Sequence, residues 1–398
     1  MEFAKRMENM KASEIREILK VTQNPEIISF AGGLPAPELF PVAEIEKLTA
    51  ELIHEHGRTL LQYSTTEGHP PLRAKIAERM NKKFKTNIGA DNILITSGSQ
   101  QGLDFAVKIF INEGDVVLCE SPSYLGAINA FNAYSPKFVE VPTDEDGLIM
   151  EALEEILATT PNVKMIYVIP DFQNPTGRTW PLVRRKQFME IITKYELPVI
   201  EDNPYGELRY EDEILPSLLS MDTKGLVAYM GTFSKTFCPG LRIGWVAAAP
   251  ELLEPFITIK QSSDLHTATL NQQIVDAYME KYDLDAHVEE IKVLYRNRRD
   301  LILKTLKEEL PACVTFTHPK GGLFLWVTLP EGVNARDVLA TCIEKKVAFV
   351  PGGPFFPNGG KENMLRINYS NMPEDRIVEG VKRMGVALKD ALAACTKA

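Results

Sequence analysis

The chain has few cysteines and no long apolar run. The five cysteines, Cys119, Cys238, Cys313, Cys342 and Cys395, are scattered. This spacing argues against a disulfide framework, predicts no metal site and suits a reducing compartment. The longest apolar runs, such as residues 163–170, reach about eight residues, whereas a bilayer span needs roughly 20. Residues 1–6 are not followed by an apolar signal segment. We therefore expect a cytoplasmic protein with no membrane association.

The chain also lacks an excess of positive charge. Asp and Glu number 54 and Lys and Arg number 44, which gives a net charge of −10. A nucleic-acid surface needs cations that neutralise phosphates, so we expect no nucleic-acid partner. The chain has 398 residues, of which 44% are apolar and 25% charged, as is typical of a globular enzyme. At roughly 150 residues per domain, this length predicts two to three domains.

The middle of the chain alternates short apolar runs with helical patterns. The runs cover residues 93–96, 116–119, 137–141, 163–169, 198–200 and 226–230. Runs this short suit strands that are buried on both faces. Between the first two runs, apolar residues from Leu103 to Ile111 recur on one face of a helix. The alternation predicts an α/β domain whose mostly parallel sheet is flanked by helices.

The C-terminal third follows an α+β pattern. Apolar residues from Ile291 to Thr305 fit one face of a long helix, residues 322–329 and 364–369 fit strands, and a last amphipathic helix spans Ile377 to Ala391. We therefore expect a large domain over residues 42–290. A smaller domain would be assembled from residues 291–398 together with an N-terminal arm, residues 1–41.

The apolar runs of the middle block are followed by polar loops. The first loop, residues 97–102, has the sequence Ser-Gly-Ser-Gln-Gln-Gly and leads into a helix. Small residues at a helix start let backbone N–H groups face an anion, which would make a phosphate cradle. The alternative is an ordinary helix cap, formed by Ser97 or Ser99, with a packing glycine.

Three further loops carry polar or aromatic side chains. Tyr124 would stack on a planar ligand or would simply be half-buried. Asn174 opens an Asn-Pro-Thr-Gly sequence, which is first of all a turn signal, although the following proline also fixes the amide. Asp202 lies where a buried strand ends, and a buried carboxylate needs a partner. That partner is either a structural arginine or a protonated nitrogen of a ligand.

Residues 231–245 form the most informative loop. Lys235 lies between Ser234 and Thr236 at the end of a buried strand. Lysine is seldom buried, and a buried lysine has a lowered pKa and can form a Schiff base. Arg242 could bind a phosphate with its planar fork. The alternative places Lys235 in an exposed loop and Arg242 in a structural ion pair.

These loops are expected at one edge of the sheet, because ligands of α/β sheets bind beyond the carboxyl ends of the strands. Together they offer phosphate donors, a stacking ring, an amide, a carboxylate and a reactive amine. Pyridoxal phosphate can use all five groups, so the combination predicts this cofactor.

The chain resembles the class I/II aminotransferases, which are fold type I enzymes dependent on pyridoxal 5'-phosphate. The resemblance rests on the motifs at residues 174–177, 202–205 and 234–242. Residues 13–19 and 29–35 make it similar to the 2-aminoadipate (LysN-like) and kynurenine/aminoadipate aminotransferase II branch. The same region is similar to MocR-type regulators, but only about 20 residues precede the shared core, so we expect no DNA-binding module.

The resemblance implies a role for each residue around the cofactor. Lys235 would form the Schiff base, Asp202 would pair with the pyridine nitrogen, Asn174 and Tyr205 would bind O3′, and Tyr124 would stack on the ring. The phosphate would be held by Ser99, Gln100, Thr232, Ser234 and Arg242. Thr232 stands where the family often has serine, which keeps the hydroxyl group.

The resemblance also implies substrate contacts and a dimer. Arg366, which would otherwise be a surface arginine on a strand, would clamp the substrate carboxylate together with Asn174. Gly33 and Arg16 match positions near the substrate side chain. Tyr63 resembles the tyrosine that reaches the phosphate of the neighbouring subunit, which implies a homodimer with shared active sites.

The resulting hypothesis is an aminotransferase. It would move an amino group from an L-amino acid of the 2-aminoadipate, aromatic or branched-chain type to a 2-oxo acid such as 2-oxoglutarate. Two alternatives remain at this stage. One is a β-lyase or decarboxylase on the same scaffold, and the other is a non-catalytic ligand-sensing module.

Overall fold

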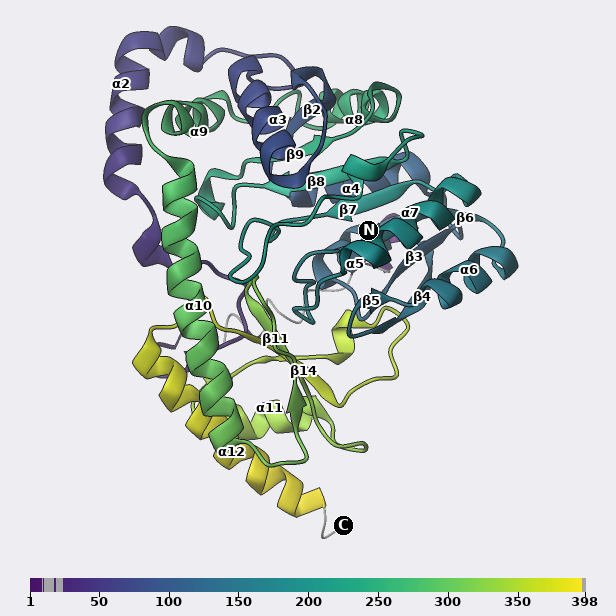
Figure 1. Ribbon diagram of the computed structural model, residues 1–398, viewed down its shortest axis with the longest axis vertical. Coiled ribbons are helices and arrows are strands. Elements are labelled where there is room, and N and C mark those ends of the chain that lie inside the picture. The colour runs from purple at the N-terminus through teal and green to yellow at the C-terminus, as the bar shows by residue number, and fades with distance from the viewer. Residues whose placement is uncertain (9, 11–17, 19–23, 396–398) are drawn as a thin grey trace.

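The larger sheet lies in the upper half of the molecule and a smaller sheet lies below it (Figure 1). The computed structural model describes residues 1–8, 10, 18 and 24–395. The helices are α2 (Val42–Leu60), α3 (Pro70–Phe84), α4 (Ser99–Phe110), α5 (Leu125–Asn132), α6 (Met150–Thr159), α7 (Leu182–Tyr195), α8 (Pro250–Ser263), α9 (Thr269–Lys281), α10 (Leu284–Glu309), α11 (Ala335–Glu344) and α12 (Glu374–Cys395). No helix in this described part of the chain is long and apolar enough to cross a membrane.

An eight-stranded sheet forms the larger layer. Its order is β2-β9-β8-β7-β6-β3-β4-β5. The strands are β2 (Ile93–Thr96), β3 (Val116–Ser121), β4 (Lys137–Asp144), β5 (Gly147–Leu148), β6 (Val163–Val168), β7 (Val199–Asp202), β8 (Val227–Thr232) and β9 (Gly244–Ala247). Strands β8, β7, β6, β3 and β4 pair in parallel, whereas β9 and β5 are antiparallel to their neighbours. The predicted mostly parallel sheet is therefore confirmed.

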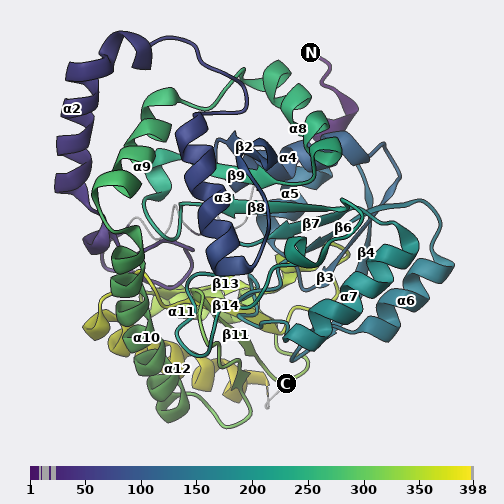
Figure 2. The ribbon, with the colours of Figure 1, turned by 45° about the horizontal axis from the view of Figure 1, so that its top comes forward.

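Helices cover both faces of this sheet, as the near-continuous apolar runs predict. Residues of α4, α5 and α8 pack on one face, and residues of α6 and α7 pack on the other. Strand β9 is antiparallel to both β2 and β8, so β2 runs in the same direction as β8. The carboxyl ends of β2, β3, β6, β7 and β8 consequently meet at one edge (Figure 2).

A four-stranded antiparallel sheet, ordered β10-β11-β14-β13, lies toward the other end of the molecule. Its strands are β10 (Thr315–Phe316), β11 (Phe324–Thr328), β13 (Val350–Pro351) and β14 (Met364–Asn368). Near it, β1 (Ile28–Ser29) pairs in parallel with β12 (Val347–Ala348), which attaches the N-terminal segment to the C-terminal third. The predicted boundary at residue 290 falls inside α10, and the division into domains stays a prediction.

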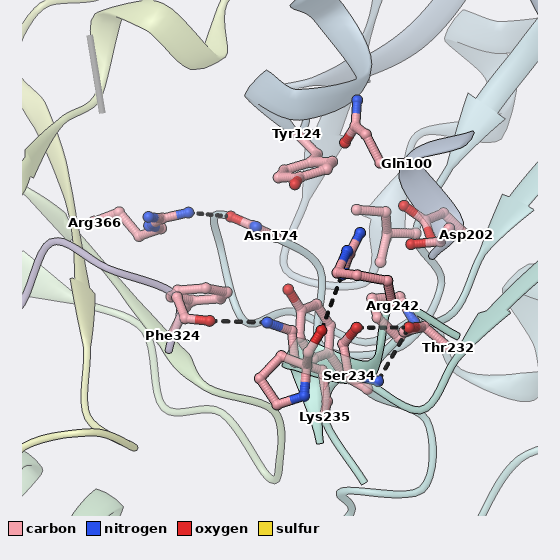
Figure 3. Close-up of a pocket in the computed structure, with 16 residues that line it drawn as sticks. Gln100, Tyr124, Asn174, Asp202, Thr232, Ser234, Lys235, Arg242, Phe324 and Arg366 are labelled. Carbon is pink, nitrogen blue, oxygen red and sulfur yellow. Dashed lines mark hydrogen bonds between the residues drawn. The ribbon is translucent and has the colours of Figure 1, made fainter. Parts of the chain in front are cut away.

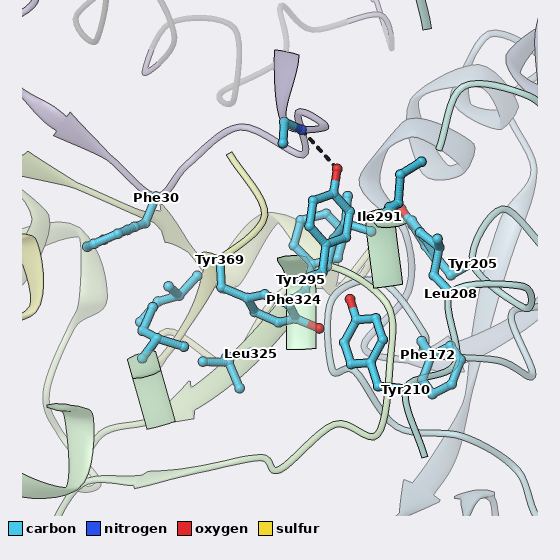
Figure 4. Close-up of a cluster of buried hydrophobic side chains, with 14 of the residues drawn as sticks. Phe30, Phe172, Tyr205, Leu208, Tyr210, Ile291, Tyr295, Phe324, Leu325 and Tyr369 are labelled. Carbon is cyan, nitrogen blue, oxygen red and sulfur yellow. Dashed lines mark hydrogen bonds between the residues drawn. The ribbon is translucent and has the colours of Figure 1, made fainter. Parts of the chain in front are cut away.

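An aromatic core joins the two sheets (Figure 4). Tyr210, Tyr295, Phe324 and Tyr369 are all buried in one cluster. The Tyr295 hydroxyl accepts a 2.8 Å hydrogen bond from the Ala36 backbone N–H, and the Tyr369 hydroxyl donates one of 2.8 Å to a backbone carbonyl. Because the phenols satisfy their polar ends, this core can hold the segments beside the sheet edge in place.

Candidate active site

One pocket lies at the carboxyl edge of the large sheet, and all the predicted site residues that the structure describes, except Tyr63, line it (Figure 3). Its volume is about 370 Å³. The lining residues are Gly33, Ser99, Gln100, Tyr124, Ile169, Asn174, Asp202, Pro204, Tyr205, Thr232, Ser234, Lys235, Pro239, Arg242, Phe324 and Arg366. Segments far apart in the sequence therefore meet at one place, as the strand order requires.

Lys235 follows β8, which is buried along its whole length. Its Nζ donates a 2.8 Å hydrogen bond to the backbone carbonyl of Gly33. Burial, together with the positive charges of Arg366 and Arg242, lowers the pKa of Lys235 to about 8. The interpretation of Lys235 as an exposed loop residue is therefore wrong. An amine with this pKa reaches its neutral, nucleophilic form far more easily than a free lysine.

The start of α4 lies beside Arg242. The helix is capped by Gly98, at a φ of 77°, without a side-chain cap hydrogen bond, so neither Ser97 nor Ser99 acts as the cap. Arg242 donates a 3.4 Å hydrogen bond through Nη2 to the carbonyl of Ser97. Within the described residues no ion pair involves Arg242, so the alternative role in a structural ion pair is not observed. A helix N-terminus and an unneutralised guanidinium together suit an anion.

Two hydroxyl groups complete this side of the pocket. The Ser234 backbone N–H donates a 3.0 Å hydrogen bond to Thr232 Oγ1, and the two hydroxyl oxygens lie 2.9 Å apart. Both side chains belong to buried residues. The turn after β8 thus presents two fixed hydroxyl groups next to Lys235.

Asp202 ends β7 and is only 2% exposed. Its Oδ2 accepts a 2.8 Å hydrogen bond from the Tyr167 hydroxyl, while Oδ1 has no hydrogen-bond partner in the described part of the chain. Burial raises the pKa of Asp202 to about 7, and the Tyr167 hydrogen bond opposes that rise. No arginine among these residues pairs with Asp202, so the structural-arginine alternative is wrong. A buried, unpartnered carboxylate oxygen suits a protonated ligand nitrogen.

Arg366 comes from β14 of the smaller sheet and is 2% exposed. It donates 2.8 Å hydrogen bonds to Asn174 Oδ1 and to the carbonyl of Ala31, and its Nε has no partner among the described atoms. Its guanidinium lies 4.2 Å from the centre of the Phe324 ring. Burial lowers the pKa of Arg366 to about 10. This buried cation with spare donor capacity can receive a carboxylate, and it is not a surface arginine.

A buried ionic cluster supports the loops that carry Asn174 and Asp202. Asp171 accepts hydrogen bonds of 2.6 Å from Arg185, 3.1 Å from Arg209 and 3.1 Å from the Asn203 side chain. Asp171 and Arg185 are 1% and 0% exposed. The cluster ties the loops after β6 and β7 to α7, and so fixes the distance between two walls of the pocket.

The sequence did not indicate several residues of this site. Phe324, Ile169, Pro204 and Pro239 line the pocket, and Tyr167 holds Asp202. Apolar and aromatic residues at strand ends are typical of a core, so composition alone gave no signal. Tyr167 could have been predicted if the strand register were known, because it pairs with Ile200 of β7, two residues before Asp202.

Tyr63 and Arg16 are the predicted residues that remain. Tyr63 is 78% exposed, and its ring packs edge-on against His266 with the ring centres 5.9 Å apart. It does not line the pocket of its own chain. Arg16 lies outside the described residues.

Comparisons with known proteins agree with this geometry. Residues 28–384 match the family model described as aminotransferase class I and II. An aromatic-amino-acid aminotransferase from Thermococcus litoralis is 44% identical over 98% of this chain and 94% of its own length. A 2-aminoadipate transaminase from Thermus thermophilus is 45% identical over 98% of this chain and 97% of its own length.

Solved structures show the same fold. The α-aminoadipate aminotransferase LysN from Thermus thermophilus, complexed with N-(5'-phosphopyridoxyl)-L-leucine, superposes with a TM-score of 0.92 at 43% identity, and 98% of each chain is covered. A multiple substrate aminotransferase from Thermococcus profundus gives 0.93 at 42% identity, with the same coverage. The resemblance inferred from the motifs is thus confirmed, and the chain belongs to the class I and II aminotransferase family.

Proposed function

We propose that this aminotransferase binds pyridoxal 5'-phosphate in the pocket around Lys235 and uses it to move an amino group from an L-amino acid to a 2-oxo acid. The observation that carries the proposal is the convergence of a half-buried amine, an unpartnered carboxylate oxygen of Asp202 and the buried cation of Arg366 on one cavity. The phosphopyridoxyl compound bound by LysN supports the same cofactor here.

The residues present fit the cofactor. When bound, pyridoxal phosphate supplies an aldehyde that accepts nitrogen and a ring that withdraws electrons. Lys235 would bind the aldehyde carbon, and Asp202 Oδ1 would accept a hydrogen bond from the protonated ring nitrogen. Tyr124 would stack on the ring, and Asn174 and Tyr205 would bind O3′. The phosphate would be held by Ser99, Gln100, Thr232, Ser234 and Arg242.

The substrate would be held from the side of the smaller sheet. Arg366 would bind its α-carboxylate through N–H groups, beside Asn174 and Gly33, which brings the substrate Cα near Lys235 Nζ. The lowered pKa of Lys235 lets the released amine take the proton from Cα and return it later, as a general base and acid. Arg16 stays a predicted contact of the substrate side chain.

The proposed donors are amino acids of the 2-aminoadipate, aromatic or branched-chain type, with 2-oxoglutarate as acceptor. Support comes from the relatives named as aminoadipate and aromatic aminotransferases. The site would be shared within a homodimer, because Tyr63 is exposed and does not line the pocket of its own chain. The scattered cysteines and the net charge of −10 support a cytoplasmic enzyme with neither nucleic-acid nor membrane partners.

The test is a donor screen with 2-oxoglutarate as acceptor, run on the wild type, on Lys235→Ala and on Lys224→Ala, which changes an exposed lysine. Glutamate should appear with at least one of the donors and not with Lys235→Ala, while Lys224→Ala should match the wild type. Pyruvate and ammonia, or carbon dioxide, formed without glutamate would favour the β-lyase or decarboxylase. Ligand binding without any product would favour the sensing module.

A further inference from the structure

Among the described residues, Tyr167 is the one that donates a hydrogen bond to the carboxylate of Asp202. The phenol lies on β6, is 1% exposed, and packs edge-on against Phe131 with ring centres 5.6 Å apart. Its hydroxyl donates a 2.8 Å hydrogen bond to Asp202 Oδ2. Because Tyr167 pairs with Ile200, it is the diagonal neighbour of Asp202 on the same face of the sheet. The strand register itself therefore sets this contact.

The hydrogen bond leaves a single oxygen of Asp202 for the ligand. Oδ1 is buried and has no partner among the described atoms, whereas Oδ2 is held by Tyr167. A carboxylate with one oxygen held by a hydrogen bond cannot rotate freely, so Oδ1 keeps a fixed orientation in the pocket. The hydrogen bond also withdraws electron density from the carboxylate and makes Asp202 a weaker base.

We propose that Tyr167 is a positioning residue. It keeps Asp202 ionised, with Oδ1 oriented toward the ring nitrogen of the cofactor, so that the proton shared by these two atoms stays on the nitrogen. This inference rests on the proposed function. Two arrangements compete in a buried pair of an acid and a pyridine: the ion pair, and a neutral pair in which the proton has moved to the acid. A donor on Oδ2 stabilises the carboxylate and favours the ion pair. The positive ring is the better electron sink.

Other titratable groups near Asp202 do not replace this donor. Burial raises the pKa of Tyr124, Tyr205 and Tyr229 above the usual phenol value, so all three are neutral at physiological pH. The cations Arg242 and Arg366 help to lower the pKa of Lys235, and their hydrogen bonds within the described residues go to groups other than Asp202. In the described part of the chain, Tyr167 is the hydrogen-bond donor that faces Asp202.

The experiment compares Tyr167→Phe with Tyr229→Phe. Tyr229 is a matched control, because it is 1% exposed on β8 of the same sheet but packs on the other core cluster, against Phe84. The first readout is the pH midpoint of the absorbance change of the bound cofactor, which reports the titration of Lys235 Nζ. The second is the rate of the half-reaction with an amino donor.

Tyr167→Phe should raise this pH midpoint. The cofactor ring is then less positive, so it repels a proton on Lys235 Nζ less strongly. The half-reaction should slow by about 10- to 100-fold, the range expected for a hydrogen bond to a charged group. Tyr229→Phe should leave both readouts at wild-type values. In an Asp202→Asn background, Tyr167→Phe should have little further effect, since the two residues act as a unit.

A second replacement covers the case in which Tyr167→Phe does not fold. Incorporation of 3-fluorotyrosine at position 167 keeps the shape and donates a stronger hydrogen bond, so the midpoint should move to lower pH. A wild-type midpoint and rate in Tyr167→Phe, or an equal loss with and without Asp202, would overturn the role of Tyr167. A wild type that binds no cofactor would instead show that the proposed function itself has failed.

Discussion

At the scale of single residues, the pocket is built from side chains that burial has shifted away from their ordinary charge states. Lys235 is surrounded by Arg366 and Arg242, and Asp202 has no cationic partner among the described residues. The protein thus holds an amine that loses its proton easily and a carboxyl that gains one easily. Both conditions cost folding free energy, and both are expected where a ligand supplies the missing partner.

Replacement of Lys235 by methionine should expose this cost. In the protein without cofactor, burial lowers the pKa of Lys235 from 10.5 to about 8. Below pH 8 the half-buried ammonium destabilises the fold. Between pH 8 and 10.5 the folded state has released a proton that the unfolded chain keeps. Lys235→Met should therefore be more stable than the wild type at pH 7, by about 3 kcal/mol.

Urea unfolding of both proteins from pH 7 to 11 measures this effect. The difference in the free energy of unfolding should shrink as the pH rises through 8 and vanish above 10.5, because the wild-type amine is then neutral in both states. A difference that does not change with pH would mean that the buried charge of Lys235 is not its source.

The chemistry of single residues also explains which residues of the site can be predicted from the sequence. Lys235, Asp202 and Arg242 can be predicted from the sequence, because charged side chains at or after the ends of buried strands need a partner, and the structure brings them into one pocket. Tyr167 and Phe324 cannot be predicted in this way, since a buried aromatic residue on a strand has the pattern of any core residue. Their roles depend on which strand lies beside them, and the local sequence does not determine the neighbouring strand.

At the scale of elements, the order of the strands creates the site. The alternating pattern predicted the parallel strands and their helices, but it did not single out β9, four residues that follow directly on the loop of Lys235 and Arg242. Strand β9 pairs between β2 and β8 and brings the start of α4 next to the turn after β8. Whether such a short segment forms a strand depends on its pairing partners more than on its own residues.

The junction between β2 and α4 leads to a second prediction. Gly98 has a φ of 77°, and a Cβ there would overlap the guanidinium of Arg242. Gly98→Ala should destabilise the fold by about 1–2 kcal/mol and weaken cofactor binding more than tenfold, because it both strains the backbone and displaces Arg242.

Gly89→Ala is the matched control, since Gly89 has a negative φ of −111° and its added Cβ meets nothing within 4 Å. Cofactor titration of both variants, followed by absorbance, makes the comparison. Equal affinities in the two variants would show that the contact between Gly98 and Arg242 does not shape the phosphate site.

At the scale of the whole molecule, the pocket lies where the two sheets meet. Lys235 and Asp202 come from the large sheet, whereas Arg366 comes from the smaller one. The net charge of −10 describes the surface as a whole, and the pocket is a local exception in which three cations gather. Any movement between the sheets would change the distance between the proposed cofactor and substrate contacts.

The proposed shared sites predict complementation between two defective proteins. Lys235→Ala removes the amine of its own pocket, and Tyr63→Ala removes a contact proposed to serve the neighbouring pocket. If subunits exchange at random in an equal mixture, half of the dimers are hybrids with one intact site, so about a quarter of wild-type sites should return.

Activity and cofactor content measured after unfolding and joint refolding test this expectation. Separately refolded proteins that are mixed only afterwards are the control and should stay defective. Joint refolding that recovers nothing beyond this control would contradict a site shared between subunits.

Chemical identification of the residue that binds the cofactor tests the proposed function most directly. The protein loaded with pyridoxal 5'-phosphate is treated with borohydride, which reduces a Schiff base to a stable amine, and its peptides are then analysed by mass spectrometry. We expect a single phosphopyridoxyl group, on Lys235. A label spread over exposed lysines, or one confined to a lysine outside the pocket, would contradict it.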